Sequence, residues 1–98
     1  MKPIAYTIGA IGSDPEWKPK FQAIKDRYED LGFHVLSPLD HPDNLTYRRY
    51  MQLSMEYVFR ADMILALPDW DRSPGATAEI YTAMSIKTPI LYEPKRRK

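Results

Sequence analysis

Residues 63–79 read MILALPDWDRSPGATAE. The apolar run at residues 63–67 is typical of a strand buried in a parallel sheet. A loop with two acids follows. Ser73-Pro74 then predicts a helix start, because a serine hydroxyl can cap free amides and proline suits the first helical position. This order of strand, loop and helix indicates an α/β fold.

Short apolar runs alternate with segments of helical period along the rest of the chain. We expect strands at residues 4–8, 33–36, 63–67 and 89–92, and helices at residues 17–31, 46–60 and 73–87. The apolar faces of the first two helices are formed by Trp17, Phe21, Ile24, Tyr28 and Leu31, and by Tyr47, Tyr50, Met51, Met55 and Val58. Gly32 suits the cap that ends the first helix, and residues 40–44 are expected to form a loop.

The alternation of four strands with three helices predicts one parallel sheet with helices on both faces. Right-handed crossovers favour the strand order 2-1-3-4, which makes the domain a Rossmann-like (flavodoxin-like) sandwich. In such sheets the ligand lies beyond the carboxyl ends of the strands, where the winding reverses. Here that point falls between the first and third strands, and the loops at residues 9–13, 37–40 and 69–73 converge on it.

Length and composition exclude several classes of protein. The 98 residues suffice for one small domain, and 44% apolar with 12% aromatic residues is a globular composition. A formal charge of +1 gives no global field for nucleic acid or a membrane surface, and no apolar segment approaches the length of a membrane span. The absence of cysteine excludes disulfides and thiol chemistry and fits a cytoplasmic protein. We expect the domain to occupy residues 1–94, followed at residues 95–98 by a solvated basic tail rather than a phosphate-binding segment.

The start of the third helix combines two features that suit a small anionic ligand. Gly75 and Ala76 leave its first turn almost without side chains, so a ligand can approach the backbone amides. Glu79 follows one turn later and supplies a carboxylate that can act as a base or nucleophile. The alternatives are an ordinary solvated glutamate at this position and a Ser73 that only caps the helix. With no cysteine and no histidine pair at ligand spacing, we expect neither a metal nor a cofactor.

Three motifs resemble the nucleoside 2-deoxyribosyltransferase-like family, which includes deoxynucleoside 5′-monophosphate N-glycosidases and short phage and bacterial members. Residues 6–12, YTIGAIG, resemble the family's tyrosine-led, glycine-bearing nucleotide loop. Residues 60–62, RAD, resemble its entry to the third strand. The most specific match is Trp70 followed by SPGATAE at residues 73–79 and by Ala83. The resemblance extends over most of the chain.

The resemblance implies an enzyme that cleaves or transfers at the N-glycosidic bond of a 2′-deoxynucleoside or its 5′-monophosphate. Glu79 would be the nucleophile at the anomeric carbon, because a carboxylate can capture the positive charge that develops on the sugar. Tyr6 would contact the sugar and Ser73 the phosphate. The rest of the ligand cradle would be formed by Gly75 and Ala76 and, opposite them, by Gly9, Ala10, Ile11 and Gly12. The family also implies a homo-oligomer whose other partners are small deoxynucleosides or deoxynucleotides.

The departing base needs a proton, for which a second acid is usual. Asp69 and Asp71, which follow the third strand, are candidates for this catalytic acid and can also be turn formers. Asp40, at the ligand edge after the second strand, is a further candidate that we place with the ligand-binding residues. Spacing alone does not rank the three.

Ser54 departs from the family pattern, since members usually carry at this position an aspartate that helps at the reacting centre. The departure favours an alternative function, a nucleotide-binding or sensing module of the same fold that has lost its chemistry. A protein that uses the fold only for interaction is a third interpretation, against which the acidic and glycine-bearing loops argue.

Overall fold

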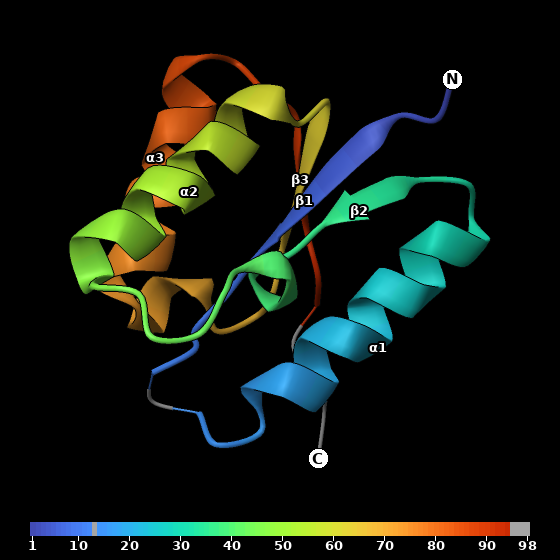
Figure 1. The fold of residues 1–98 in the computed structure, drawn as a ribbon. Helices are drawn as coiled ribbons and strands as arrows, with labels where there is room; N and C mark the ends of the chain where they lie inside the picture. Colours follow the sequence, from blue (N-terminus) through green and yellow to red (C-terminus); the bar gives the residue numbers. More distant parts are fainter. Residues whose placement is uncertain (13, 95–98) are drawn as a thin grey trace.

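A four-stranded parallel sheet lies between helices in the computed structural model, which describes residues 1–12 and 14–94 (Figure 1). The strands are β1 (Ile4–Ile8), β2 (His34–Leu36), β3 (Met63–Ala66) and β4 (Ile90–Tyr92). The helices are α1 (Trp17–Asp30), α2 (Tyr47–Arg60) and α3 (Pro74–Ser85), with short 3-10 helices η1 (Pro38–Asp40) and η2 (Trp70–Arg72). The strand order β2-β1-β3-β4 confirms the predicted Rossmann-like topology.

β1 pairs with β2 on one side and with β3 on the other. Tyr6 is in register with Leu36 of β2 and with Ile64 of β3. The chain therefore winds one way from β1 to β2 and the other way to β3, and Ile8 is paired with Ala66 where both strands end. Loops that leave two such strands diverge, which leaves room for a ligand at this edge.

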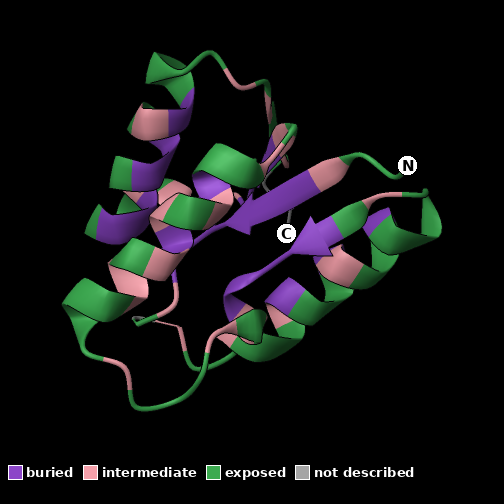
Figure 2. Ribbon diagram, turned by 45° about the horizontal axis from the view of Figure 1, so that its top comes forward, coloured by how far each residue is buried: buried purple, intermediate pink, exposed green. Residues whose placement is uncertain are grey.

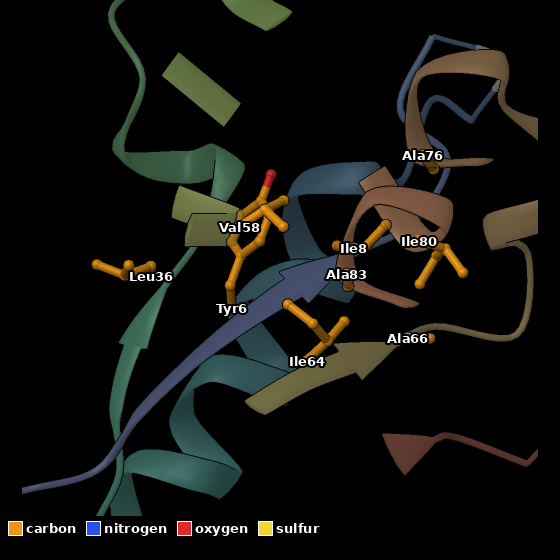
Figure 3. Close-up of a cluster of buried hydrophobic side chains, with 9 residues drawn as sticks. All are labelled: Tyr6, Ile8, Leu36, Val58, Ile64, Ala66, Ala76, Ile80 and Ala83. Atoms are coloured by element: carbon orange, nitrogen blue, oxygen red, sulfur yellow. The ribbon is translucent and has the colours of Figure 1, made fainter. Parts of the chain in front are cut away.

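Each face of the sheet carries its own apolar core, and Figure 2 shows the buried residues on the inner sides of the helices. α1 covers one face with Phe21, Ile24 and Tyr28, which belong to the same cluster as Ala5 and Leu65. α2 and α3 cover the other face. Figure 3 shows that cluster, which consists of Tyr6, Ile8, Leu36, Val58, Ile64, Ala66, Ala76, Ile80 and Ala83. Neighbouring side chains of one strand thus enter opposite cores, and the prediction of helices on both faces is confirmed.

The helix ends follow the signals in the sequence. Gly32 has a φ of +102°, the left-handed conformation that suits the end of α1. The Thr46 hydroxyl accepts a hydrogen bond from the Arg49 amide at 3.1 Å and caps α2. The Ser73 hydroxyl accepts one from the Ala76 amide at 3.3 Å, so the predicted start of α3 is confirmed.

Several details differ from the predictions. Most elements are one or two residues shorter at an end, where terminal residues act as caps or lack partners. Leu31, expected on the buried face of α1, is 68% exposed because it follows the last helical residue. Tyr47, expected on the buried face of α2, is 66% exposed because the helix covers the core only farther along, with Ser54 and Val58. Asp40 ends a 3-10 helix instead of beginning a loop.

The end of the described chain is fastened to α1. The Glu93 carboxylate accepts a hydrogen bond from the Tyr28 hydroxyl at 3.2 Å and forms an ion pair with Arg27. The predicted basic tail, residues 95–98, lies outside the described residues. No helix in the described part of the chain combines the length and apolarity needed to cross a membrane.

Candidate functional site

Tyr6 and Glu79 meet in the interior between β1 and α3. The Tyr6 hydroxyl donates a hydrogen bond to Oε2 of Glu79 at 2.6 Å. Tyr6 is completely buried and Glu79 is 6% exposed. Tyr6 points toward α3 because alternate residues of β1 face that side of the sheet, and Glu79 lies in the second turn of α3, after the cap at Ser73. The fold therefore holds one carboxylate in a fixed orientation with a hydrogen-bond donor behind it.

A cavity of about 340 Å³ opens next to Glu79 at the carboxyl end of β1. Its volume is in the range of small-molecule sites. The loop after β1 and the starts of α2 and α3 supply its lining, which consists of Gly9, Ile11, Gly12, Leu45, Tyr47, Tyr50, Met51, Ser73, Gly75, Ala76 and Glu79. Glu79 is the one acidic side chain among the described residues that line the cavity. The cavity lies where the winding of the sheet reverses, the point that the sequence pattern predicts for a ligand.

Two glycines allow the walls of the cavity to approach each other. A Cβ atom on Gly75 would lie 2.9 Å from the Tyr47 hydroxyl, so α2 and α3 meet at this point because residue 75 has no side chain. A Cβ atom on Gly9 would lie 3.0 Å from Cβ of Leu67, at the end of β3. A Cβ atom on Gly12 would meet no atom within 4 Å. The loop after β1 is thus tightly packed at Gly9 and has open space at Gly12.

The buried carboxyl group has an unusual acidity. Burial raises the pKa of Glu79 from its ordinary value of 4.5 to about 7, although hydrogen bonding with Tyr6 and Ser54 acts in the opposite direction. Burial and the neighbouring carboxylate raise the pKa of the Tyr6 hydroxyl well above 10, so Tyr6 remains a neutral donor. Glu79 therefore changes charge near neutral pH, where a carboxyl group can act as a nucleophile or base in one form and as an acid in the other.

A family model described as Domain of unknown function (DUF4406) matches residues 3–92. The chain belongs to this family. No curated protein matches the sequence of this DUF4406 domain.

Two solved structures share the fold of the DUF4406 domain. The 2-desoxiribosyltransferase from Leishmania mexicana is 14% identical, with a TM-score of 0.75 over 92% of this chain and 63% of that chain. The 2-deoxyribosyltransferase from Bacillus psychrosaccharolyticus is 16% identical, with a TM-score of 0.71 over 91% of this chain and 70% of that chain. The DUF4406 chain thus spans less than two thirds of the Leishmania protein. These similarities show a nucleoside 2-deoxyribosyltransferase-like fold, as the sequence motifs predict.

The DUF4406 domain also has a second polar group behind Glu79. Ser54 of α2 is completely buried, and its Oγ lies 3.1 Å from Nε2 of His41. The Ser54 hydroxyl is close enough to Tyr6 and Glu79 to favour their charged forms by hydrogen bonding. Ser54 lies four residues after Tyr50, so helical periodicity places both on one face of α2. This spacing is a signal in the sequence that Ser54 lies near the site. His41 carries no such signal, because it follows η1 and its ring reaches Ser54 only through contacts with α2 that form in the folded chain.

The three candidate acids do not belong to the described lining of the cavity. Oδ1 of Asp69 accepts a hydrogen bond from the Ala10 amide at 3.1 Å, and its Oδ2 lies 2.6 Å from Nζ of Lys20. Asp69 therefore fastens the loop after β1, and Ala10 contributes its amide to this contact. Asp71 is exposed in η2, and Asp40 completes the capping box of η1.

Most of the other predicted site residues surround one cavity. They are Gly9, Ile11, Gly12, Ser73, Gly75, Ala76 and Glu79, with Tyr6 behind Glu79. Within residues 1–12 and 14–94, no three acidic or histidine side chains are grouped in a way that could hold a metal ion. The arrangement combines a helix start suited to an anion with a carboxylate that can stabilise or capture a positive centre.

Proposed function

We propose that this DUF4406 protein cleaves or transfers at the N-glycosidic bond of a 2′-deoxynucleoside or its 5′-monophosphate, with Glu79 as the nucleophile. The observation that carries the proposal is the buried Glu79 carboxylate beside the cavity of about 340 Å³, oriented by the Tyr6 hydroxyl at 2.6 Å. The shared fold of two 2-deoxyribosyltransferases supports the choice of substrate class.

The chemistry starts at the bond between C1′ and the base. As this bond lengthens, its electron pair leaves with the base and positive charge develops on the sugar. The Glu79 carboxylate donates an electron pair to C1′ and forms a glycosyl ester, while the departing base takes up a proton from water. Water or a second base then attacks C1′ and loses a proton to the solvent, while the bond between C1′ and the Glu79 oxygen breaks and releases the carboxylate. Only the deprotonated form of Glu79 can act, so its pKa of about 7 predicts an activity that rises through neutral pH.

The walls of the cavity support the orientation of the ligand. Tyr50, Met51 and Leu45 offer aromatic and apolar surface on which a nucleobase can stack. The first turn of α3, with Ser73 and Gly75, offers a hydroxyl, a backbone amide and the positive end of the helix dipole to a 5′-phosphate. The sugar would then lie between these two regions, within reach of the carboxylate.

The exposed side of α2 supports a second copy of the chain as a partner. Tyr47, Met51, Met55 and Phe59 recur every four residues along this helix, and Tyr47 and Phe59 are 66% and 63% exposed. Tyr47 and Met51 also line the cavity, so a copy docked there would narrow its open side. Sedimentation should show a dimer or larger assembly that Phe59→Asp dissociates. A wild-type monomer at every concentration would contradict this part of the proposal.

The activity is tested by incubating the protein with each deoxynucleoside and deoxynucleoside monophosphate, with and without a second base as acceptor. Chromatography then measures free or exchanged base. Glu79→Gln should lower the rate by about a thousandfold or more, because the amide cannot attack C1′. Glu56→Gln is the matched control, since Glu56 is exposed on α2. Absence of turnover with every substrate, or equal turnover by Glu79→Gln, would refute the proposed reaction.

A nucleotide-binding module without chemistry is the second candidate function. The observation in its favour is Ser54, which places a hydroxyl and not a second carboxylate beside Glu79. Calorimetry would distinguish the two, because this candidate requires binding of a nucleotide with no release of base.

A further inference from the structure

His41, which follows η1, and Ser54 of α2 form a polar pair near Glu79. Nε2 of His41 lies 3.1 Å from Oγ of Ser54. The imidazole stacks on the Tyr57 ring with the centroids 5.1 Å apart and meets the Tyr50 ring edge-on at 5.0 Å. Two aromatic contacts therefore fix the plane of the imidazole, and its Nε2 is aimed at a buried hydroxyl.

The Ser54 hydroxyl can serve only one acceptor at a time. It carries a single proton and is close enough to Glu79 to stabilise the carboxylate. If Nε2 of His41 is unprotonated, it can accept that proton and divert the hydroxyl from Glu79. If Nε2 carries a proton, it donates to Oγ, and the Ser54 proton remains available for the carboxylate. The state of one imidazole nitrogen thus decides where the serine points.

We propose that His41 is a positioning residue, whose Nε2–H group holds the Ser54 hydroxyl in the orientation that donates to the Glu79 carboxylate. The inference rests on the proposed function in that Glu79 is taken as the reacting group. Glu79 then has two neutral donors, Tyr6 from β1 and Ser54 from α2, and both favour the carboxylate that attacks C1′.

The groups around the pair are compatible with this direction of donation. Burial lowers the pKa of His41, while Asp40 of η1 acts in the opposite direction, so the ring is neutral at neutral pH with a proton on one nitrogen. Tyr50 and Tyr57 of α2 also face His41, and burial raises the pKa of both hydroxyls, so both are neutral. Tyr50 is likewise a neighbour of Glu79.

Three variants separate the hydrogen bond from packing. His41→Phe keeps an aromatic ring between Tyr50 and Tyr57 but has no N–H group. His41→Gln keeps an amide N–H at similar reach without a group that titrates. Ser54→Ala removes the hydroxyl itself.

The direct readout is the pKa of Glu79, followed by a ¹³C NMR titration of glutamate-labelled protein and assigned with Glu79→Gln. His41→Phe and Ser54→Ala should each raise this pKa by about one unit, and the double variant should raise it no further than Ser54→Ala alone. His41→Gln should leave it near the wild-type value. The acidic limb of kcat/KM should move with the titration, to higher pH in His41→Phe and not in His41→Gln.

A Glu79 pKa that is unchanged in His41→Phe would overturn the inference, and so would an equal rise in His41→Gln. The titration needs no substrate, so it gives an answer even if the protein releases no base. Conversely, turnover that depends on Glu79, combined with an unmoved titration, would leave the proposed function intact and refute the role of His41. Folding of each variant is checked by the dispersion of the same NMR spectra.

Discussion

Glu79→Gln is expected to make the protein more stable above neutral pH while it abolishes activity. The buried Glu79 carboxylate destabilises the folded protein, because the unfolded chain exposes the same charge to water. Glutamine has nearly the same shape, carries no charge, and still offers an oxygen that can accept the hydrogen bond from Tyr6. The substitution thus removes the free-energy cost of burying a charged carboxylate, which the protein bears because the proposed chemistry needs that carboxylate.

The magnitude follows from the pKa of Glu79 in the two states. The ordinary value of 4.5 applies to the unfolded chain, and burial raises the pKa to about 7 in the folded protein. Because the folded pKa is the higher one, the group's stabilising contribution is fully present below about pH 4.5 and is lost as the pH rises through about 7. At 1.36 kcal/mol per pKa unit, the loss amounts to about 3 kcal/mol, of which about 2 to 3 kcal/mol falls between pH 5 and pH 8.

Urea unfolding followed by tryptophan fluorescence measures this effect. The free energy of unfolding is determined for the wild type and for Glu79→Gln at several values between about pH 5 and about pH 8. The difference between the two proteins should grow in favour of Glu79→Gln by about 2 to 3 kcal/mol over this range, while His41 titrates in both and cancels to first order. Glu56→Gln, at an exposed position, should show no such trend. A difference for Glu79→Gln that is constant with pH would refute the assignment of a raised pKa.

Substitutions at four further positions have clear expected outcomes. Tyr6→Phe keeps the buried ring but removes the hydrogen-bond donor 2.6 Å from Glu79, so the pKa of Glu79 should rise above about 7. The acidic limb of activity should then move to higher pH. An NMR titration in which the pKa of Glu79 is unchanged would contradict this role of Tyr6. Gly9→Ala should lower the free energy of unfolding in urea by about 1 to 3 kcal/mol, because its Cβ would lie 3.0 Å from a side chain at the end of β3. Gly12→Ala places its Cβ in open space, so its loss of stability should be much smaller. Ser73→Ala should cost about 1 kcal/mol through loss of the cap on the Ala76 amide, and Ser73→Thr, which retains the oxygen, should cost less; equal losses would contradict the capping role.

Local patterns in the sequence were sufficient for most of the fold. The apolar run at residues 63–67, the cap at Ser73 and the left-handed Gly32 each depend on neighbours within a few residues, and the structure confirms all three signals. The exposed Leu31 and Tyr47 were predicted as buried, because periodicity identifies a helix face but not where the underlying core ends. The strand order required one further rule, the right-handed crossover, which is independent of any side chain.

The candidate site divides in the same way. Its position beyond β1 and β3 and the bare start of α3 follow from topology and residue type. The partners of its charged groups do not follow from topology or residue type. Asp69 was predicted as a catalytic acid, and in the structure its carboxylate contacts Lys20 and the Ala10 amide. No local pattern predicts such contacts, since they form between segments that are far apart in the chain.

The sequence by itself determined the elements, their order in the sheet and the edge where a ligand can bind, because near neighbours and chain handedness control all of these. Only the tertiary structure decided the state of Glu79. Its pKa of about 7 results from burial between β1, α2 and α3, and its orientation from Tyr6, 73 positions away, with Ser54 and His41 behind it. Solvation and hydrogen bonding act through space, so residues that are distant in the sequence set the charge of the group proposed to carry the chemistry.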